Sequence, residues 1–249
     1  MDALTAELIK LKRSLAWPIV IGLPVVLVLA GAATQLADGT TPEDGWDTVW
    51  LQSVGFYGLF PLAVGIAVLG SLVWRVEHRG SNWNALMSSP ASSLRIVVAK
   101  AAVIAGLTAL MQIILYLSVL AIGKLAFSLE GMPDSQHLSI TALLVVATVP
   151  AAVLQSGLSM LMRSFAVPIA VALLASGFST AALMVAGNAA LVSPYGLATR
   201  TALLGTGSFV DEGTITGGDV AAILIAAALG TVVLVLCTTA VLEHRDTRV

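Results

Sequence analysis

The chain has 249 residues, of which 58% are hydrophobic and only 10% are charged, and its formal net charge is −2. Soluble domains carry about 25% charged residues, so this composition excludes an ordinary water-soluble fold. A near-neutral chain without a basic patch also gives no basis for binding nucleic acid. The single cysteine, Cys237, lies inside an apolar run and cannot form an internal disulfide.

The first predicted element is an amphipathic helix over residues 1–16. Four leucines recur at the spacing of one helical face: Leu4, Leu8, Leu11 and Leu15. Charged residues fall elsewhere on the helical wheel: Asp2, Glu7, Lys10 and Arg13. We therefore predict a helix that lies along the membrane surface, with a simple membrane anchor as the alternative.

Six apolar runs follow, and each is long enough to cross a bilayer, which takes about 20 apolar residues. The spans are predicted near residues 17–37, 52–74, 98–123, 139–162, 166–187 and 219–242. They leave no room for a second domain, so residues 1–249 are predicted to form one all-α transmembrane domain. Prolines are expected to interrupt, open or bend these spans at Pro24, Pro61, Pro150 and Pro168.

The first run follows basic residues, as the core of a secretory signal does. That core is roughly 7–15 residues long, and this run is longer, so we expect an uncleaved span. Ten of the twelve Lys and Arg residues fall on the same side as the N-terminus, and only Lys124 and Arg200 fall on the other. The distribution predicts that both termini lie in the cytoplasm.

No Asp, Glu, Lys or Arg lies in the middle of a predicted span, although ion-coupled transporters usually carry such residues there. The spans contain amides and hydroxyls instead, at Gln112, Ser118, Gln155, Ser156 and Ser159. We expect these to join neighbouring helices rather than to contact a substrate. Catalytic, metal-binding and nucleotide-binding motifs are absent from the sequence, so energy for uphill work must come from another chain.

The most charged short stretch, WRVEHRGSNWNALMSSP, connects the second and third spans. Gly80 can end the second span, Ser81 can cap a short new helix, and Pro90 can stop it. Three apolar side chains share one face of that helix: Trp83, Leu86 and Met87. The pattern predicts a short cytoplasmic helix that binds a partner protein or the lipid headgroups, with an ordinary interfacial loop as the alternative.

The segment between the fifth and sixth spans, LVSPYGLATRTALLGTGSFVDEGT, is too apolar for a solvated loop. Ser193 and Pro194 predict the start of a helix, with proline at its first position. Four side chains are expected to dip into the outer leaflet: Leu191, Tyr195, Leu203 and Leu204.

The order of residues from Glu77 to Lys100 resembles the first cytoplasmic loop of ABC transporter type-2 permeases. It is most similar to the small six-span permeases of the lantibiotic-immunity and bacitracin-export kind. In that family an acidic residue ends span two, a short coupling helix follows, and a basic residue opens span three. The matching positions here are Glu77, Trp83, Asn84, Leu86, Pro90 and Lys100.

The resemblance implies three functional groups of residues. An ATPase-coupling group would comprise Glu77, Ser81, Trp83, Asn84, Leu86 and Met87. A connecting helix would carry Leu4, Leu8, Leu11 and Leu15, and a re-entrant outer gate would contain Pro194 and Tyr195. An ordinary interfacial loop is the alternative for the outer segment.

The resemblance also implies partners, place and activity. The partners would be a cytoplasmic ABC ATPase subunit that binds ATP and Mg, a second copy of this permease or a related one, and membrane lipid. The chain would hold no cofactor of its own and would lie in a bacterial plasma membrane. It would export an amphipathic or hydrophobic substrate, such as a lantibiotic-like peptide or a drug.

Two other classes remain open on the sequence. One is a secondary transporter or channel that is not coupled to ATP, which the lack of midplane charges disfavours. The other is a non-transporting membrane scaffold or an intramembrane enzyme, and the missing catalytic motifs disfavour the enzyme.

Overall fold

A computed structural model describes residues 3–11, 14–37, 39–79, 82–88, 91–208 and 211–246. Within these ranges the chain is all helical, as predicted. The helices are α1 (Ala3–Leu11), α2 (Ala16–Ala37), α3 (Trp46–Gly58), α4 (Pro61–Arg75), α5 (Asn82–Met87), α6 (Ser93–Leu125), α7 (Ser135–Ala147), α8 (Val149–Leu161), α9 (Ala166–Ala186), the 3₁₀ helix η1 (Gly187–Val192), α10 (Pro194–Ala202) and α11 (Gly217–Asp246).

Among the described residues, five helical stretches are long and apolar enough to cross a membrane: α2, α6, α7 with α8, α9 with η1, and α11. The bent pair of α3 and α4 adds a sixth when it is counted as one span. This agrees with the six predicted spans. The molecule is therefore a multi-pass membrane protein.

The second span differs from its prediction as one helix over residues 52–74. It begins at Trp46, and it breaks between Gly58 and Pro61 with a bend of 49°. Pro61 opens α4 because it has no backbone N–H to continue the preceding helix. The hydroxyl of Thr199 in α10 donates to the carbonyl oxygens of Gly58 at 2.9 Å and Leu59 at 3.3 Å, and so satisfies backbone groups at the break.

Pro150 opens α8 directly after α7, and Pro168 lies in the first turn of α9, as predicted. Pro24 lies inside α2, which is one helix from Ala16 to Ala37, so it neither interrupts nor opens its span. The third span begins earlier than predicted, at Ser93, because the Ser92 hydroxyl caps α6 by accepting a hydrogen bond from the amide of Arg95.

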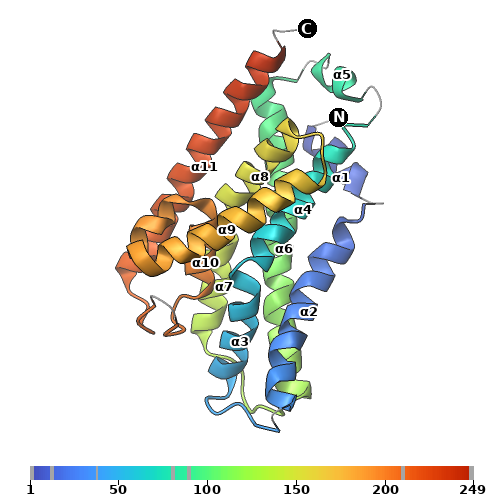
Figure 1. The fold of residues 1–249 in the computed structure, drawn as a ribbon. Helices are drawn as coiled ribbons and strands as arrows, with labels where there is room; N and C mark the ends of the chain where they lie inside the picture. Colours follow the sequence, from blue (N-terminus) through green and yellow to red (C-terminus); the bar gives the residue numbers. More distant parts are fainter. Residues whose placement is uncertain are drawn as a thin grey trace.

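The helices form one elongated bundle in which α1, α5, the connection between α8 and α9, and the last turns of α11 lie at the same end (Figure 1). We call this the terminal end. The connections from α2 to α3 and from α6 to α7 lie at the other end of the bundle (Figure 1).

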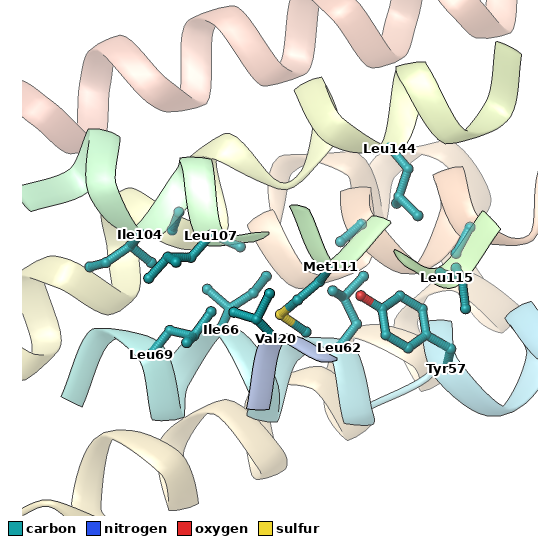
Figure 2. Packing of buried hydrophobic residues seen from close by; sticks show 14 of the residues in the cluster. Val20, Tyr57, Leu62, Ile66, Leu69, Ile104, Leu107, Met111, Leu115 and Leu144 are labelled. Carbon is teal, nitrogen blue, oxygen red and sulfur yellow. The ribbon is translucent and has the colours of Figure 1, made fainter. Parts of the chain in front are cut away.

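The bundle core lies where α4 and α6 meet their neighbours. Figure 2 shows Leu62, Ile66, Ile104 and Met111 together there, with Tyr57 from α3 beside them. These side chains are buried almost completely. Their packing fixes α4 and α6 side by side, and the terminal ends of these two helices carry the site described below.

The polar side chains in the spans were expected to join helices, and two of them do. Gln155 donates to the Tyr195 hydroxyl at 2.5 Å, and Ser156 accepts from the indole of Trp74 at 3.0 Å. The prediction is wrong for Ser118, which donates to a carbonyl of its own helix. The side-chain amide of Gln112 and the hydroxyl of Ser159 meet no hydrogen-bond geometry with any described residue.

Candidate functional site

The predicted short helix after the second span is present as α5, Asn82–Met87. Its predicted cap and stop, Ser81 and Pro90, lie outside the described residues, so their roles stay predictions. Asn82 and Asn84 are exposed on α5. The Asn82 amide also donates to the carbonyl of Val76, which ties the start of α5 to the end of α4.

The apolar side chains of α5 lie partly buried against the bundle itself. Trp83, Leu86 and Met87 pack against a cluster that Trp74, Ile96, Val97, Met160 and Leu242 form. This cluster joins α4, α6, α8 and α11. The sequence identified which side chains share a face of α5, but not that this face packs on the protein's own core.

Two aromatic contacts attach α5 to the bundle. The rings of Trp83 and His78 are stacked, with centroids 5.7 Å apart and planes within 7°. His78 in turn places its Nε2 2.8 Å from the carbonyl oxygen of Ser159 in α8. Trp74 of α4 lies beside both rings and donates its indole N–H to Ser156, which also belongs to α8. A displacement of α5 therefore acts directly on α4 and α8.

Beside this stack lies a ring of four alternating charges, of which Lys10 is exposed and the other three are buried. Lys100 of α6 contacts Glu7 at 2.9 Å and Glu77 at 3.0 Å, and Lys10 contacts Glu7 at 2.8 Å and Glu77 at 2.5 Å. Lys100 is 1% exposed and Glu77 is 3% exposed. The Lys100 ammonium also lies 4.7 Å from the centre of the Trp74 ring, a cation–π contact. We call these four residues the charge cluster.

The neighbouring charges shift the pKa of two members of the charge cluster, Glu77 and Lys10. Burial by itself would raise the pKa of Glu77, but the ammonium groups of Lys100 and Lys10 outweigh it and hold that pKa below its ordinary value. Burial would likewise lower the pKa of Lys10, but its hydrogen bonds to Glu7 and Glu77 outweigh it and raise that pKa. Among the described residues, the two carboxylates of the cluster face two ammonium groups, so its buried charges are paired.

The N-terminal helix differs from its predicted form. It ends at Leu11 rather than near residue 16, and Leu15 lies beyond it with 67% of its surface exposed. The side chains of Leu4 and Leu8 lie outside the described residues. Glu7 and Leu11 form the buried face of α1, which packs along α6. The helical wheel placed Glu7 away from that face, because a wheel cannot foresee that Lys100 supplies a buried partner.

Glu77 and Lys100 match the family in the sequence, but their contacts with Glu7 and Lys10 were not predicted. One signal was available. Lys100 is a single charge at the start of a long apolar run, and a charge there needs a partner from another segment. The contributions of Trp74 and His78 depend on contacts more than 80 residues apart in the sequence, which the sequence does not encode locally.

The predicted outer segment begins as expected. Pro194 occupies the first turn of α10, and the hydroxyl of Ser193 caps it by accepting a hydrogen bond from the amide of Gly196. Tyr195 is buried and accepts a hydrogen bond from Gln155 of α8. The four side chains expected to dip into the outer leaflet are instead buried in the protein: Leu191, Tyr195, Leu203 and Leu204.

A buried ion pair organises the loop after α10, and the sequence analysis did not anticipate it. Arg200 donates to Asp211 at 2.6 Å. The second carboxylate oxygen of Asp211 accepts hydrogen bonds from the amides of Gly207 and Gly213. One aspartate thus closes the loop onto α10.

Comparison with protein families matches residues 3–179 to the family described as ABC-2 family transporter protein. Neither the curated proteins nor the solved structures gave a match to this chain. The matched region contains α1, the charge cluster and α5. The chain belongs to the ABC-2 transporter family, whose members are membrane components of ABC transporters, and this membership implies an ABC ATPase partner in general.

Proposed function

We propose that this chain is the permease subunit of an ATP-driven exporter in a bacterial plasma membrane, with the terminal end in the cytoplasm. Two observations support the proposal: the family membership, and the short helix α5, which has two exposed asparagines and packs against several spans. The excess of basic residues on the side of the termini supports this orientation. ATP and Mg would bind in a separate cytoplasmic ABC ATPase.

The contacts around α5 suit a coupling role. A push on α5 reaches α4 and α8 through the Trp83–His78 stack and reaches α6 and α11 through the apolar cluster. The charge cluster adds α1, because Glu77 follows α4 while Glu7 and Lys10 belong to α1. One docked partner would therefore move five elements together. In this role α1 is the connecting helix.

The proposed pathway lies between this permease and a second copy or a related permease. The large apolar side chains that remain exposed on α9 and α11 are available to lipid or to such a partner. Since these faces carry few charges, the substrate would be amphipathic or hydrophobic, for instance a lantibiotic-like peptide or a drug. Pro194 and Tyr195 in α10 would belong to the outer gate.

The experiment is co-purification with the cognate ABC ATPase, which is to be sought as a neighbouring reading frame with a Walker A motif. Because Trp83 and Leu86 pack on the core, changing them would disturb the fold as well as docking. Asn84→Arg is the sharper variant, since it adds bulk and charge at an exposed position of α5. The matched control is Asn188→Arg, at an exposed asparagine of η1, which follows α9 at the far end of about 30 Å of helix.

We expect Asn84→Arg to lose most of the bound ATPase and its stimulated ATP hydrolysis, while Asn188→Arg retains both. Both variants should melt at the wild-type temperature. Equal ATPase binding by the two variants would show that α5 is not the docking site. Transport by vesicles that contain this chain alone, without ATP, would contradict the exporter itself.

A further inference from the structure

A second feature of the terminal end is a pocket of about 220 Å³ between α4, α8 and the start of α9. It lies beside His78, on which the α5 tryptophan stacks. Its polar lining comprises mainly Arg75, Arg79, Arg163, His78, Ser71 and Ser159. The mechanism proposed above makes no use of this pocket.

The charge of the pocket has one sign. Three arginines line it, and its lining contains no carboxylate from the described part of the chain. The three arginines are exposed at the mouth of the pocket, and among the described residues no Asp or Glu lies within ion-pair distance of them. Arg75 places its guanidinium 5.4 Å from the ring centre of Phe165, which leaves its N–H donors available. The pocket is therefore strongly electropositive.

Two buried serine hydroxyls also line the pocket and can donate hydrogen bonds to an anion. Ser71 is 5% exposed and Ser159 is 1% exposed, and neither side-chain oxygen meets hydrogen-bond geometry with a described residue. A buried hydroxyl without a partner is costly. The hydroxyls of these two serines and the guanidinium groups of the three arginines are thus the hydrogen-bond donors that line the pocket.

We propose that this pocket binds the phosphate of an anionic phospholipid from the leaflet at the terminal end. Phosphate oxygens accept hydrogen bonds from guanidinium forks and hydroxyls alike. Basic pockets between transmembrane helices on the cytoplasmic side bind anionic headgroups in this manner.

The surroundings favour a lipid over a soluble phosphate. Arg75 ends α4 and Arg163 follows α8, so both lie where apolar helices emerge from the hydrocarbon layer. Arg75 and Arg79 also line a neighbouring, largely apolar groove of about 330 Å³. Its walls include Leu11, Leu72 and Val103, with Glu7 and Lys10 of the charge cluster at one side. A phospholipid has both the anionic group and the apolar chains that this combination accommodates. The inference does not depend on coupling to an ATPase.

The test is native mass spectrometry of the purified full-length chain in detergent, titrated with phosphatidylglycerol and, separately, with phosphatidylcholine. We expect preferential retention of phosphatidylglycerol. The Arg75→Gln/Arg163→Gln variant should bind it roughly 25-fold more weakly, at about fivefold for each arginine. The control Arg95→Gln removes an exposed arginine at the same end that does not line this pocket, and it should bind as wild type does.

A second variant keeps the test independent of surface charge. Ser159→Ala removes a buried hydroxyl that has no hydrogen-bond partner among the described residues, so it should fold at least as stably as wild type while binding phosphatidylglycerol several-fold more weakly. Inorganic phosphate forms the remaining arm. If inorganic phosphate alone binds the chain at the same concentration as the lipid does, the lipid assignment is wrong. Equal retention of both lipids, or an equal loss in Arg95→Gln, would overturn the site.

Discussion

Replacing Lys100 with methionine tests how the terminal end is held together. Its ammonium lies 2.9 Å from Glu7 and 3.0 Å from Glu77, and only 1% of the residue is exposed. Without it, two buried carboxylates face the single ammonium of Lys10. Breaking a buried ion-pair network by removing one partner costs about 3–5 kcal/mol. The lost cation–π contact with Trp74 adds to this cost.

Thermal unfolding in detergent, followed by tryptophan fluorescence, measures the loss. At roughly 2–4 °C for each kcal/mol in a chain of this size, Lys100→Met should lower Tm by on the order of 10 °C. The matched variant is Lys10→Met, whose lysine has 34% of its side chain exposed. Water already solvates this ammonium in part, and Lys100 still pairs with both carboxylates, so the loss should be about 1 kcal/mol.

A double variant separates charge from packing. Lys100→Met with Glu77→Gln leaves Glu7 and Lys10 as one balanced pair, so the double variant should be more stable than Lys100→Met alone. The reasoning fails if Lys100→Met melts with wild type. It fails equally if the double variant loses the sum of the two single losses, because independent sites behave in that way.

Three further predictions concern the same framework. The folded-state pKa of Glu77 is below its ordinary value of 4.5, so its contribution to stability should be present above pH 4.5 and lost as the pH falls below that value. When Tm is measured against pH, Glu77→Gln should therefore lack the part of the fall in Tm that this group causes. Thr199→Val keeps the side-chain shape but leaves the Gly58 carbonyl at the span break without its donor, so denaturant titration should reveal a loss of about 1–3 kcal/mol. Gly58→Ala would place a Cβ 2.5 Å from that of Ala202 and should lower Tm. Gly106→Ala meets nothing within 4 Å and should leave Tm unchanged. Equal Tm values for the two variants would contradict the close approach of α3 and α10.

The elements that the sequence predicted well are those with local signals. Apolar run length located the spans, because the bilayer thickness alone sets that length. The Ser193–Pro194 pair located the start of α10, since a cap and its proline are adjacent in the chain. The short helix α5 was likewise visible from Trp83, Leu86 and Met87 at helical spacing.

The features that were missed depend on partners distant in the sequence. Lys100 lies 93 residues from Glu7, so nothing near either residue indicates that they meet. The helical wheel of the N-terminal segment assumed that charges face water, which fails wherever another segment supplies a counter-charge. The break at Pro61 was expected only as an interruption. Its stabilisation by Thr199 depends on a contact 141 residues away.

These long-range contacts divide the second span into two parts with different attachments. Between the break and the terminal end, α4 is tied to α1 and α6 by the charge cluster and to α8 by Trp74. Parting them would expose or isolate buried charge at a cost of several kcal/mol. At the break, α10 is joined by the Thr199 hydroxyl and by the close approach of Gly58 to Ala202, which together are worth less. A force applied at α5 would therefore move α1, α4, α6 and α8 as one unit, and the angle at residues 58–61 is where that movement would be taken up.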